Sequence, residues 1–456
     1  MRRFHVLACD YDGTLARHGQ VDAPTMAALE QVRASGRRLV MVTGRRLAEL
    51  LETFSSAHVF DRLVVENGAV VYDPATGAEK VLAEAPSPRF IETLRARGVG
   101  PIAVGHTIVA TWEPHGTTVL EVIRDLGLGM QIVLNKGAVM VLPGTVSKAT
   151  GLEHALGEFG LSPRNAVAVG DAENDHVLLT YCECGAAVSN AVQALKDRAD
   201  IILERDHGDG VIDLIEQIVD NDLSRWMTNC PRRRLELGST AGGDPVRLPT
   251  FGVGVALESQ ALDSLQPLLD SLIQQWNAQG YQWCAVSLAS TQLTEKAEVN
   301  LGTETQAPEM DAVIRALDNP RHSIFVNCAH LNAFDQGTFL KALANTLAER
   351  RRTSGRPHWV CWMGAAQALK NAGINLDELG AGMVFADAVE AHDSDLPTKL
   401  QRVRVVDRRG LADTSTVDTS GVAFKSFHWL VSDDGKVRLE PADIDHHNSH
   451  SSKPTP

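Results

Sequence analysis

The sequence has no surplus of positive charge, and this limits the partners that it can bind. It contains 43 Lys and Arg residues against 57 Asp and Glu residues, for a net charge of -14. Proteins that bind nucleic acid mainly through the phosphate backbone need an excess of cations. The composition therefore argues against broad, sequence-independent nucleic-acid binding, although a local basic patch is compatible with it.

The chain also lacks a cysteine framework and a long apolar run. Its 7 cysteines are scattered and odd in number, which predicts reduced thiols and a cytoplasmic protein. Cys182 and Cys184 are too close together for a zinc knuckle and have no partner pair, so we expect a structural role. The apolar run near the N-terminus is too short for a signal peptide, and no uncharged stretch approaches the length of a membrane span. We expect no membrane association.

What the sequence does have is the composition of a globular protein, with 44% hydrophobic and 22% charged residues. A chain of 456 residues is too long for one ordinary hydrophobic core. Two or three domains are therefore expected.

The stretch that organises the first part of the chain is Asp10-Tyr11-Asp12-Gly13-Thr14-Leu15. It follows an apolar run, residues 4–9, that predicts a buried strand. Ligands of open α/β sheets bind beyond the carboxyl ends of the strands. One carboxylate could attack as a nucleophile and the other could exchange protons with a leaving group. The alternative is a loop that caps a helix with Asp and turns at Gly.

A second strand, Leu39-Val40-Met41-Val42, is followed by Thr43-Gly44-Arg45. A hydroxyl again lies at a strand end, next to a glycine that allows close approach of the backbone to a ligand. Thr43 is also a candidate N-cap of the next helix. Alternating strands and helices predict a parallel, doubly wound sheet. From residue 74 to residue 143 shorter strands and two helices predict an inserted α+β cap over the sheet end.

The parallel pattern returns at Ser147-Lys148, where a helix begins. A cation is unfavourable at a helix N-terminus, so Lys148 suggests a nearby anion, the alternative being a solvated lysine. A further strand, residues 166–169, ends in Gly170-Asp171-Ala172-Glu173-Asn174-Asp175. Hard oxygen ligands at a strand end suit Mg²⁺, although some of these acids could only cap the following helix.

These four segments, in this order, resemble the haloacid dehalogenase superfamily of phosphatases, and in particular its Cof-type branch with a cap between the second and third motifs. The motifs are DYDGTL, VTGR, the Lys of VSKATGL and GDAENDHVLL, and Thr43 and Lys148 are 105 positions apart. The resemblance covers residues 1–220. It implies an α/β fold with a Rossmann-like parallel sheet and an α+β cap.

The resemblance also implies the chemistry. Asp10 would attack phosphorus and form an aspartyl-phosphate, and Asp12 would be the general acid and base. Thr43, Gly44, Arg45 and Lys148 would bind the substrate phosphate, with Thr43 and Lys148 counted as catalytic. A Mg²⁺ site would be formed by Asp10, Asp12 through its backbone carbonyl, Asp171, Asn174 and Asp175. The substrate would be a small phosphorylated metabolite similar to a sugar phosphate.

The second half of the chain predicts a further α/β domain, residues 249–432, after a linker at 221–248 that is rich in Arg, Gly and Ser. Its order of strands and helices resembles a P-loop ATPase. The phosphate loop GxxxxGK[ST] is absent from residues 256–264, and no acid lies at Trp362-Met363-Gly364. The resemblance is therefore to a degenerate domain without ATP hydrolysis. Residues 433–456 predict a disordered tail.

The expected domains are thus a phosphatase core at 1–73 and 144–220, a cap at 74–143, the linker, the C-terminal domain and the tail. The first functional hypothesis is a Mg²⁺-dependent phosphatase with a non-catalytic accessory domain. The second is a regulatory protein in which the C-terminal domain binds a protein partner. The third is a phosphosugar mutase, which uses the same nucleophile.

Overall fold

The computed structural model describes residues 2–227, 230–240, 245–250, 252–259, 261–289, 295–379, 381–388, 401–406, 427–431 and 437–441. The chain divides into two compact units. One comprises Met1–Arg232 with Arg350–Arg356, and the other comprises the remainder.

The core of the N-terminal unit is an eight-stranded sheet in the order β12-β11-β10-β1-β2-β3-β4-β5. Its strands are β1 (Val6–Cys9), β2 (Arg38–Val42), β3 (Arg62–Val65), β4 (Val70–Asp73), β5 (Ala78–Val81), β10 (Ala166–Gly170), β11 (Cys184–Ala187) and β12 (Ile201–Ile202). All neighbours from β12 to β3 are parallel, and β4 and β5 extend the sheet in antiparallel fashion. The central strands are buried on both faces, which explains why they are continuous apolar runs in the sequence.

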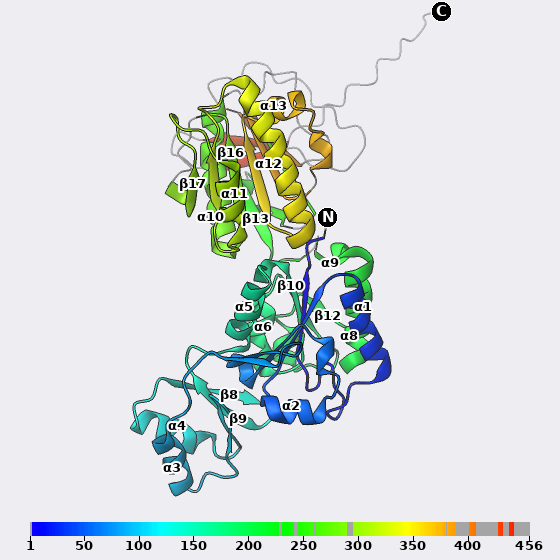
Figure 1. Ribbon diagram of the computed structural model, residues 1–456, viewed down its shortest axis with the longest axis vertical. Coiled ribbons are helices and arrows are strands. Elements are labelled where there is room, and N and C mark those ends of the chain that lie inside the picture. The colour runs from blue at the N-terminus through cyan, green and yellow to red at the C-terminus, as the bar shows by residue number, and fades with distance from the viewer. Residues whose placement is uncertain are drawn as a thin grey trace, which may run out of the picture. The chain divides into compact units, whose positions relative to one another are not determined.

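Helices cover both faces of this sheet (Figure 1). They are α1 (Ala23–Ala34), α2 (Leu47–Thr53), α5 (Lys148–Glu158), α6 (His176–Tyr181), α7 (Gln193–Lys196), α8 (His207–Asn221) and α9 (Ser224–Met227), with short 3-10 turns η1 (Ala57–Val59), η2 (Glu66–Gly68), η3 (Pro163–Asn165) and η4 (Glu173–Asp175). Helices α1 and α8 pack together on one face, and α5 and α6 on the other. This is the predicted doubly wound α/β architecture.

The cap is a four-stranded antiparallel sheet in the order β6-β7-β9-β8, covered by two helices. Its elements are α3 (Pro88–Ala96), β6 (Ala103–Val104), β7 (Val109–Trp112), α4 (Gly116–Asp125), β8 (Met130–Asn135) and β9 (Ala138–Pro143). Because side chains alternate along a strand, Val139 and Val141 pack beneath the helices in the cap core. Ala138 and Met140 face the other way and line a cavity.

The C-terminal unit contains an eleven-stranded sheet in the order β14-β13-β23-β22-β21-β15-β20-β19-β16-β18-β17. The strands are β13 (Arg234–Thr240), β14 (Pro245–Pro249), β15 (Val255–Ser259), β16 (Trp283–Ser287), β17 (Val299–Leu301), β18 (Ile324–Asn327), β19 (Trp359–Met363), β20 (Met383–Ala388), β21 (Gln401–Val406), β22 (Phe427–Val431) and β23 (Val437–Pro441). Strands β21, β15, β20, β19, β16, β18 and β17 form a continuous parallel block.

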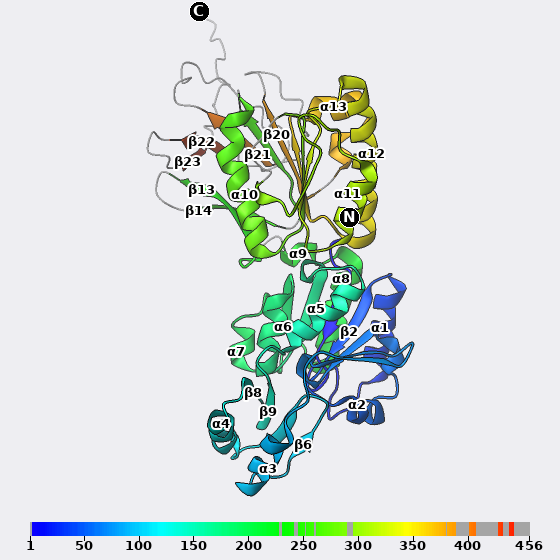
Figure 2. The same cartoon turned by 60° about the vertical axis from the view of Figure 1, so that its left-hand side comes forward.

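Helices also cover both faces of the second sheet. They are α10 (Gln266–Gln279), α11 (Met310–Asp318), α12 (Ala333–Ser354) and α13 (Ala366–Asn371), with η5 (Leu262–Leu265) and η7 (Leu376–Glu378). Helix α10 lies on one face and α11 to α13 lie on the other (Figure 2). Along β19, Trp359 and Cys361 belong to the core beneath α10, whereas Val360 and Trp362 belong to the core on the opposite face. The predicted second α/β fold is therefore present.

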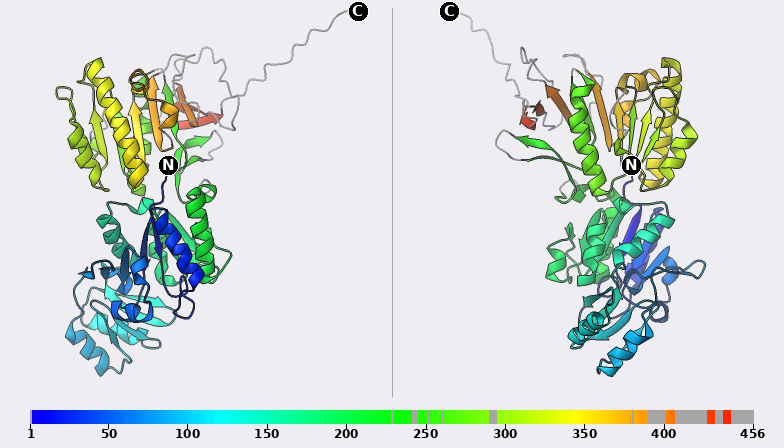
Figure 3. Two further views of the ribbon diagram at one scale, coloured as in Figure 1. Left: turned by 45° about the vertical axis from the view of Figure 1, so that its right-hand side comes forward. Right: turned by 90° about the vertical axis from the view of Figure 1, so that its left-hand side faces the viewer.

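Some expected boundaries differ from the structure. Strand β5 lies within residues assigned to the cap but pairs with β4 in the core sheet. The expected linker, 221–248, contains α9 and most of the antiparallel β13–β14 pair (Figure 3). The expected tail includes β23, and its residues 442–456 lie outside the described part of the chain. Residues 256–259 belong to β15 and residues 262–264 to η5, and the P-loop resemblance remains a prediction.

Within the described ranges, the helices are all too short or too polar to cross a membrane.

Candidate active site

The predicted motif residues meet at the carboxyl end of the first sheet, because β1, β2 and β10 are parallel neighbours. Asp10 and Asp12 follow β1, Thr43 and Gly44 follow β2, and Asp171 follows β10. Side chains more than 100 residues apart in sequence are thus brought to one edge of the sheet, as the strand pattern predicts.

A buried ion cluster lies at the centre of this edge. The Lys148 ammonium donates to Asp10 Oδ1 at 2.5 Å and to Asp175 Oδ1 at 2.6 Å. The Lys148 side chain is 1% exposed, and the two carboxylates are almost fully buried as well. Two anions therefore compensate for a cation at the first residue of α5, where the helix dipole alone would disfavour it.

The local sequence explains how Lys148 is held. Ser147 caps α5 by accepting from the Thr150 amide, and Thr150 Oγ1 accepts from the Ser147 amide in return. Gly68 has φ +104°, and a Cβ at this position would overlap the Ser147 carbonyl. Glycine at 68 therefore allows η2 to approach the start of α5 closely enough to fix the direction of the lysine.

The charges in the cluster perturb one another. Burial raises the pKa of Asp10 well above its ordinary value, and the neighbouring Asp175 raises it further, while Lys148 opposes both effects. Burial alone would lower the pKa of Lys148, but Asp10 and Asp175 outweigh that effect and raise it. The lysine is therefore a fixed positive charge beside the Asp10 carboxylate.

The site also contains the ligands for a divalent cation. Carboxylate oxygens of Asp10, Asp171 and Asp175 lie within 4.8 Å of one another. Asn174 is buried, and its Oδ1 has no hydrogen-bond partner, while its Nδ2 donates to Asn67 at 2.9 Å. An orphaned amide oxygen beside three carboxylates is a hard donor set of the kind that Mg²⁺ prefers.

Asp175 has an orienting role within this group. Its Oδ2 accepts from the amides of Asp171 and Ala172 at 3.0 Å each, while its Oδ1 accepts from Lys148. Both oxygens are therefore engaged by protein donors. Among the three carboxylates, Asp10 is the most exposed, with 7% of its side chain accessible against 0% for Asp171 and Asp175.

Asp12 lies at the rim of the site and is paired with Arg45. The Arg45 Nε and Nη2 atoms donate to the two Asp12 carboxylate oxygens at 2.6 and 2.7 Å. The Asp12 side chain is 40% exposed, so it can reach a bound ligand. Thr43 is buried, and its Oγ1 accepts from the Arg45 amide at 3.2 Å within the loop after β2. The alternative role of Thr43 as a helix N-cap is wrong, because α2 begins at Leu47 and its N-cap residue is Arg46.

A cavity of about 490 Å³ opens between these residues and the cap. The core contributes Asp10, Asp12, Thr43, Gly44, Arg45, Arg46 and Glu49. The cap contributes mostly apolar side chains, which are Pro101, Ile102, Ala103, Ile108, Ala110, Trp112, Ala138 and Met140, together with Thr111, Asn135 and Lys136. The cavity can hold a small molecule that has a charged end and a less polar body.

Four contact residues were not predicted from the sequence. Lys136 donates from the cap to Asp171 Oδ2 at 2.5 Å, and Thr14 donates to Asp171 Oδ1 at 3.1 Å. Asn67 Oδ1 accepts a hydrogen bond from the Asn174 Nδ2 at 2.9 Å. Glu66 is fully buried and accepts from the amides of His106 and Thr107 in the cap at 2.9 and 3.1 Å.

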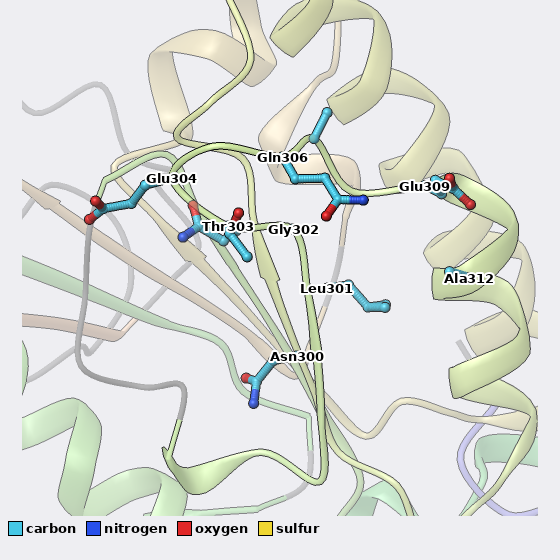
Figure 4. Close-up of a pocket in the computed structure, with 10 residues that line it drawn as sticks. Asn300, Leu301, Gly302, Thr303, Glu304, Gln306, Glu309 and Ala312 are labelled. Atoms are coloured by element: carbon cyan, nitrogen blue, oxygen red, sulfur yellow. The ribbon is translucent and has the colours of Figure 1, made fainter.

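A second cavity, of about 560 Å³, lies in the C-terminal unit at the end of β17 (Figure 4). Its charged lining residues are Glu304 and Glu309, and no lysine or arginine is among the residues that line it. A phosphate group would meet only like charge there. This cavity does not provide an alternative phosphate site.

Comparisons with known proteins find relatives of the N-terminal unit. Residues 7–114 and 130–215 match the family model of haloacid dehalogenase-like hydrolases. A phosphoglycolate phosphatase of Halorubrum lacusprofundi is 29% identical over 226 residues, which cover 46% of this chain and 96% of that protein. A phosphoglycolate phosphatase of Natronomonas pharaonis is 28% identical over 230 residues, covering 47% and 98%. A crystal structure of a haloacid dehalogenase-like hydrolase from Bacteroides thetaiotaomicron is 18% identical, covers 47% of this chain and 99% of that chain, and has a TM-score of 0.41.

Over the matched residues, the N-terminal unit is similar to the haloacid dehalogenase-like hydrolases. The predicted resemblance to this superfamily and the predicted enzyme class, a phosphoric monoester hydrolase, are thereby confirmed. The family match ends at residue 215 and leaves the C-terminal unit without an assignment.

Proposed function

We propose that this protein is a Mg²⁺-dependent phosphatase that hydrolyses small organic phosphate monoesters through a phosphorylated Asp10. The observation that carries the proposal is the Asp10 carboxylate, held at 2.5 Å by a buried ammonium and placed beside Asp171 and Asp175. The sequence-based expectation of a substrate similar to a sugar phosphate belongs to the same proposal.

In the first step an Asp10 oxygen attacks phosphorus, and the bond between phosphorus and the ester oxygen breaks. Asp12 gives a proton to the departing alkoxide, so that an alcohol leaves. Lys148 remains protonated and offsets the charge on the phosphoryl oxygens, and the hydroxyl of Thr43 can hydrogen-bond one of them. Positioning and charge neutralisation are the main requirements of phosphoryl transfer.

In the second step water attacks the phosphorus of the aspartyl-phosphate. Asp12 accepts a proton from this water, and Asp10 leaves as a carboxylate together with inorganic phosphate. Arg45 holds Asp12 through two hydrogen bonds and orients it towards the cavity. Mg²⁺, held by Asp10, Asp171, Asn174 and the Asp12 carbonyl, would supply charge that draws the phosphate towards Asp10.

The C-terminal unit is proposed as a non-catalytic accessory domain. Its cavity lacks a lining cation, and residues 256–264 lack the glycine run and lysine of a phosphate loop. Binding of a protein partner through this unit remains part of the proposal.

The test is phosphate release from a panel of small phosphate esters, with Mg²⁺ and with a chelator. The panel should include sugar phosphates. It should also include 2-phosphoglycolate, because the two relatives described above are named phosphoglycolate phosphatases. Turnover that requires Mg²⁺ supports the proposal. Failure of the folded protein to hydrolyse any ester in the presence of Mg²⁺ overturns it.

A further inference from the structure

The tip of the β8–β9 hairpin in the cap carries a lysine at a backbone position that does not favour one. Asn135 and Ala138 are paired, so Lys136 and Gly137 form a two-residue turn, with φ values of +48° and +88°. Turns with positive φ at both positions favour Asn, Asp and Gly. Local backbone preference therefore does not explain a lysine at position 136.

This lysine reaches from the cap to the catalytic edge of the core. Its ammonium lies 2.5 Å from Asp171 Oδ2, although half of the side chain is exposed. Gly13 leaves the necessary space, because a Cβ there would overlap both the Lys136 Nζ and the Asp171 carboxylate. The exposure allows the ammonium to exchange its carboxylate partner for a ligand.

The other cations at the site lie on the core, and each has a carboxylate nearby; Arg46, which also lines the cavity, lies 3.7 Å from Glu49. Lys148 is buried between Asp10 and Asp175, and Arg45 is held on Asp12. Lys136 is the only charged residue among the cap residues that line the cavity in the described structure. Most of its cap neighbours are apolar and provide no other compensation for a negative charge on the substrate.

We infer that Lys136, placed by the hairpin tip beside Asp171 at the cavity wall, selects substrates that carry a second anionic group, such as a carboxylate, next to the phosphate ester. This inference rests on the proposed phosphatase function and adds the chemical class of its substrate. A divalent cation held by Asp171 would weaken the attraction between Asp171 and the ammonium. The half-exposed Lys136 ammonium pairs with the second anion of the substrate, and Lys136 acts as a specificity-determining residue.

The test compares two esters of similar size that differ in this charge, 2-phosphoglycolate and 2-hydroxyethyl phosphate. The variants are Lys136→Asn, which suits the positive φ, and Lys136→Arg, which retains the charge. The measured quantity is the ratio of kcat/KM for the carboxylated ester to kcat/KM for the neutral ester. A general effect on the metal or on cap closure changes both values together and cancels in the ratio.

We expect wild type to prefer the carboxylated ester. Lys136→Asn should reduce the preference roughly 10- to 100-fold, the range for one charge-assisted contact, mainly by raising KM. Lys136→Arg should restore most of the preference. The thermal unfolding temperature of Lys136→Asn should not fall, because Asn is compatible with the turn.

Two failures can be told apart. If wild type hydrolyses both esters and Lys136→Asn leaves the ratio of the two kcat/KM values unchanged, the proposed role of Lys136 in substrate selection is wrong and the phosphatase proposal stands. If wild type hydrolyses neither ester nor any member of the panel, the proposed function and this inference are both wrong.

Discussion

Replacing Lys148 with Met tests whether its ammonium compensates the charge of the two buried carboxylates in the site. The substitution keeps the length of the side chain but removes the ammonium that bridges Asp10 and Asp175 at 2.5 and 2.6 Å. Both carboxylates then remain buried without this cation. Removing one partner of a buried ion pair typically costs about 3–5 kcal/mol. We expect a loss of this size in the free energy of opening of the N-terminal unit at pH 8 in the presence of a chelator.

The pH dependence has a definite sign. The pKa of Asp10 is already raised by burial and by Asp175, and removing Lys148 raises it further. An acid with a raised pKa in the native state stabilises that state at low pH, and this contribution is lost as the pH rises through the native pKa. The destabilisation by Lys148→Met should therefore be smaller at pH 5 than at pH 8.

The assay is native-state hydrogen exchange of peptides from β1 and β10, because it reports on the N-terminal unit even when the two units unfold separately. Lys80→Met, at an exposed position of β5, is the matched control and should change the opening free energy by less than about 0.5 kcal/mol. A loss below about 1 kcal/mol for Lys148→Met at pH 8, or a larger loss at pH 5, would refute the reasoning.

Two further predictions concern other buried acids. Burial raises the pKa of Asp387 to about 6, and Glu258 adds to the effect, so its stabilising contribution is present below about pH 4 and is lost as the pH rises through 6. Asp387→Asn should therefore stabilise the C-terminal unit at pH 8 by about 2–3 kcal/mol and much less at pH 4, and equal thermal shifts at the two pH values would contradict this. Glu66→Ala removes the acceptor for the buried amide of Thr107, which should cost about 1–3 kcal/mol and speed hydrogen exchange in the β6–β7 turn. Unchanged exchange there would show that Glu66 does not hold the cap.

The site residues that follow strands can be predicted from the sequence, because a strand and its end are indicated by local patterns. An apolar run followed by Asp10 or by Asp171 predicts both the strand and the edge at which it ends. Parallel pairing of β1 with β2 and β10 then brings these residues together. Lys148 at a helix start predicts a nearby anion, and the structure places two carboxylates against it.

Contacts that depend on how the cap docks could not be predicted in this way. The turn at Lys136-Gly137 is recognisable between two strand-like runs, but its distance from Asp171 depends on the docking of the cap, which no local pattern encodes. The same holds for Glu66, whose partners are backbone amides in the cap.

The linker error has a different cause. The glycines and serines near residue 240 indicate a linker, whereas residues 234–237 alternate, with Leu235 and Leu237 buried and Glu236 exposed. That two-residue period is the signal of a half-buried strand. The sequence of residues 234–237 therefore indicates the strand that the structure contains as β13.

The most direct test of the central claim is to trap the phosphorylated enzyme. The enzyme is mixed with a substrate from the panel and Mg²⁺, quenched in acid, reduced with borohydride to convert an aspartyl-phosphate to homoserine, and mapped by peptide mass spectrometry. We predict conversion at position 10 alone, dependent on Mg²⁺, and neither conversion nor phosphate release in Asp10→Asn, whereas Asp220→Asn, at an exposed position of α8, should behave as wild type. Modification at another residue, or undiminished turnover by Asp10→Asn, would contradict Asp10 as the nucleophile.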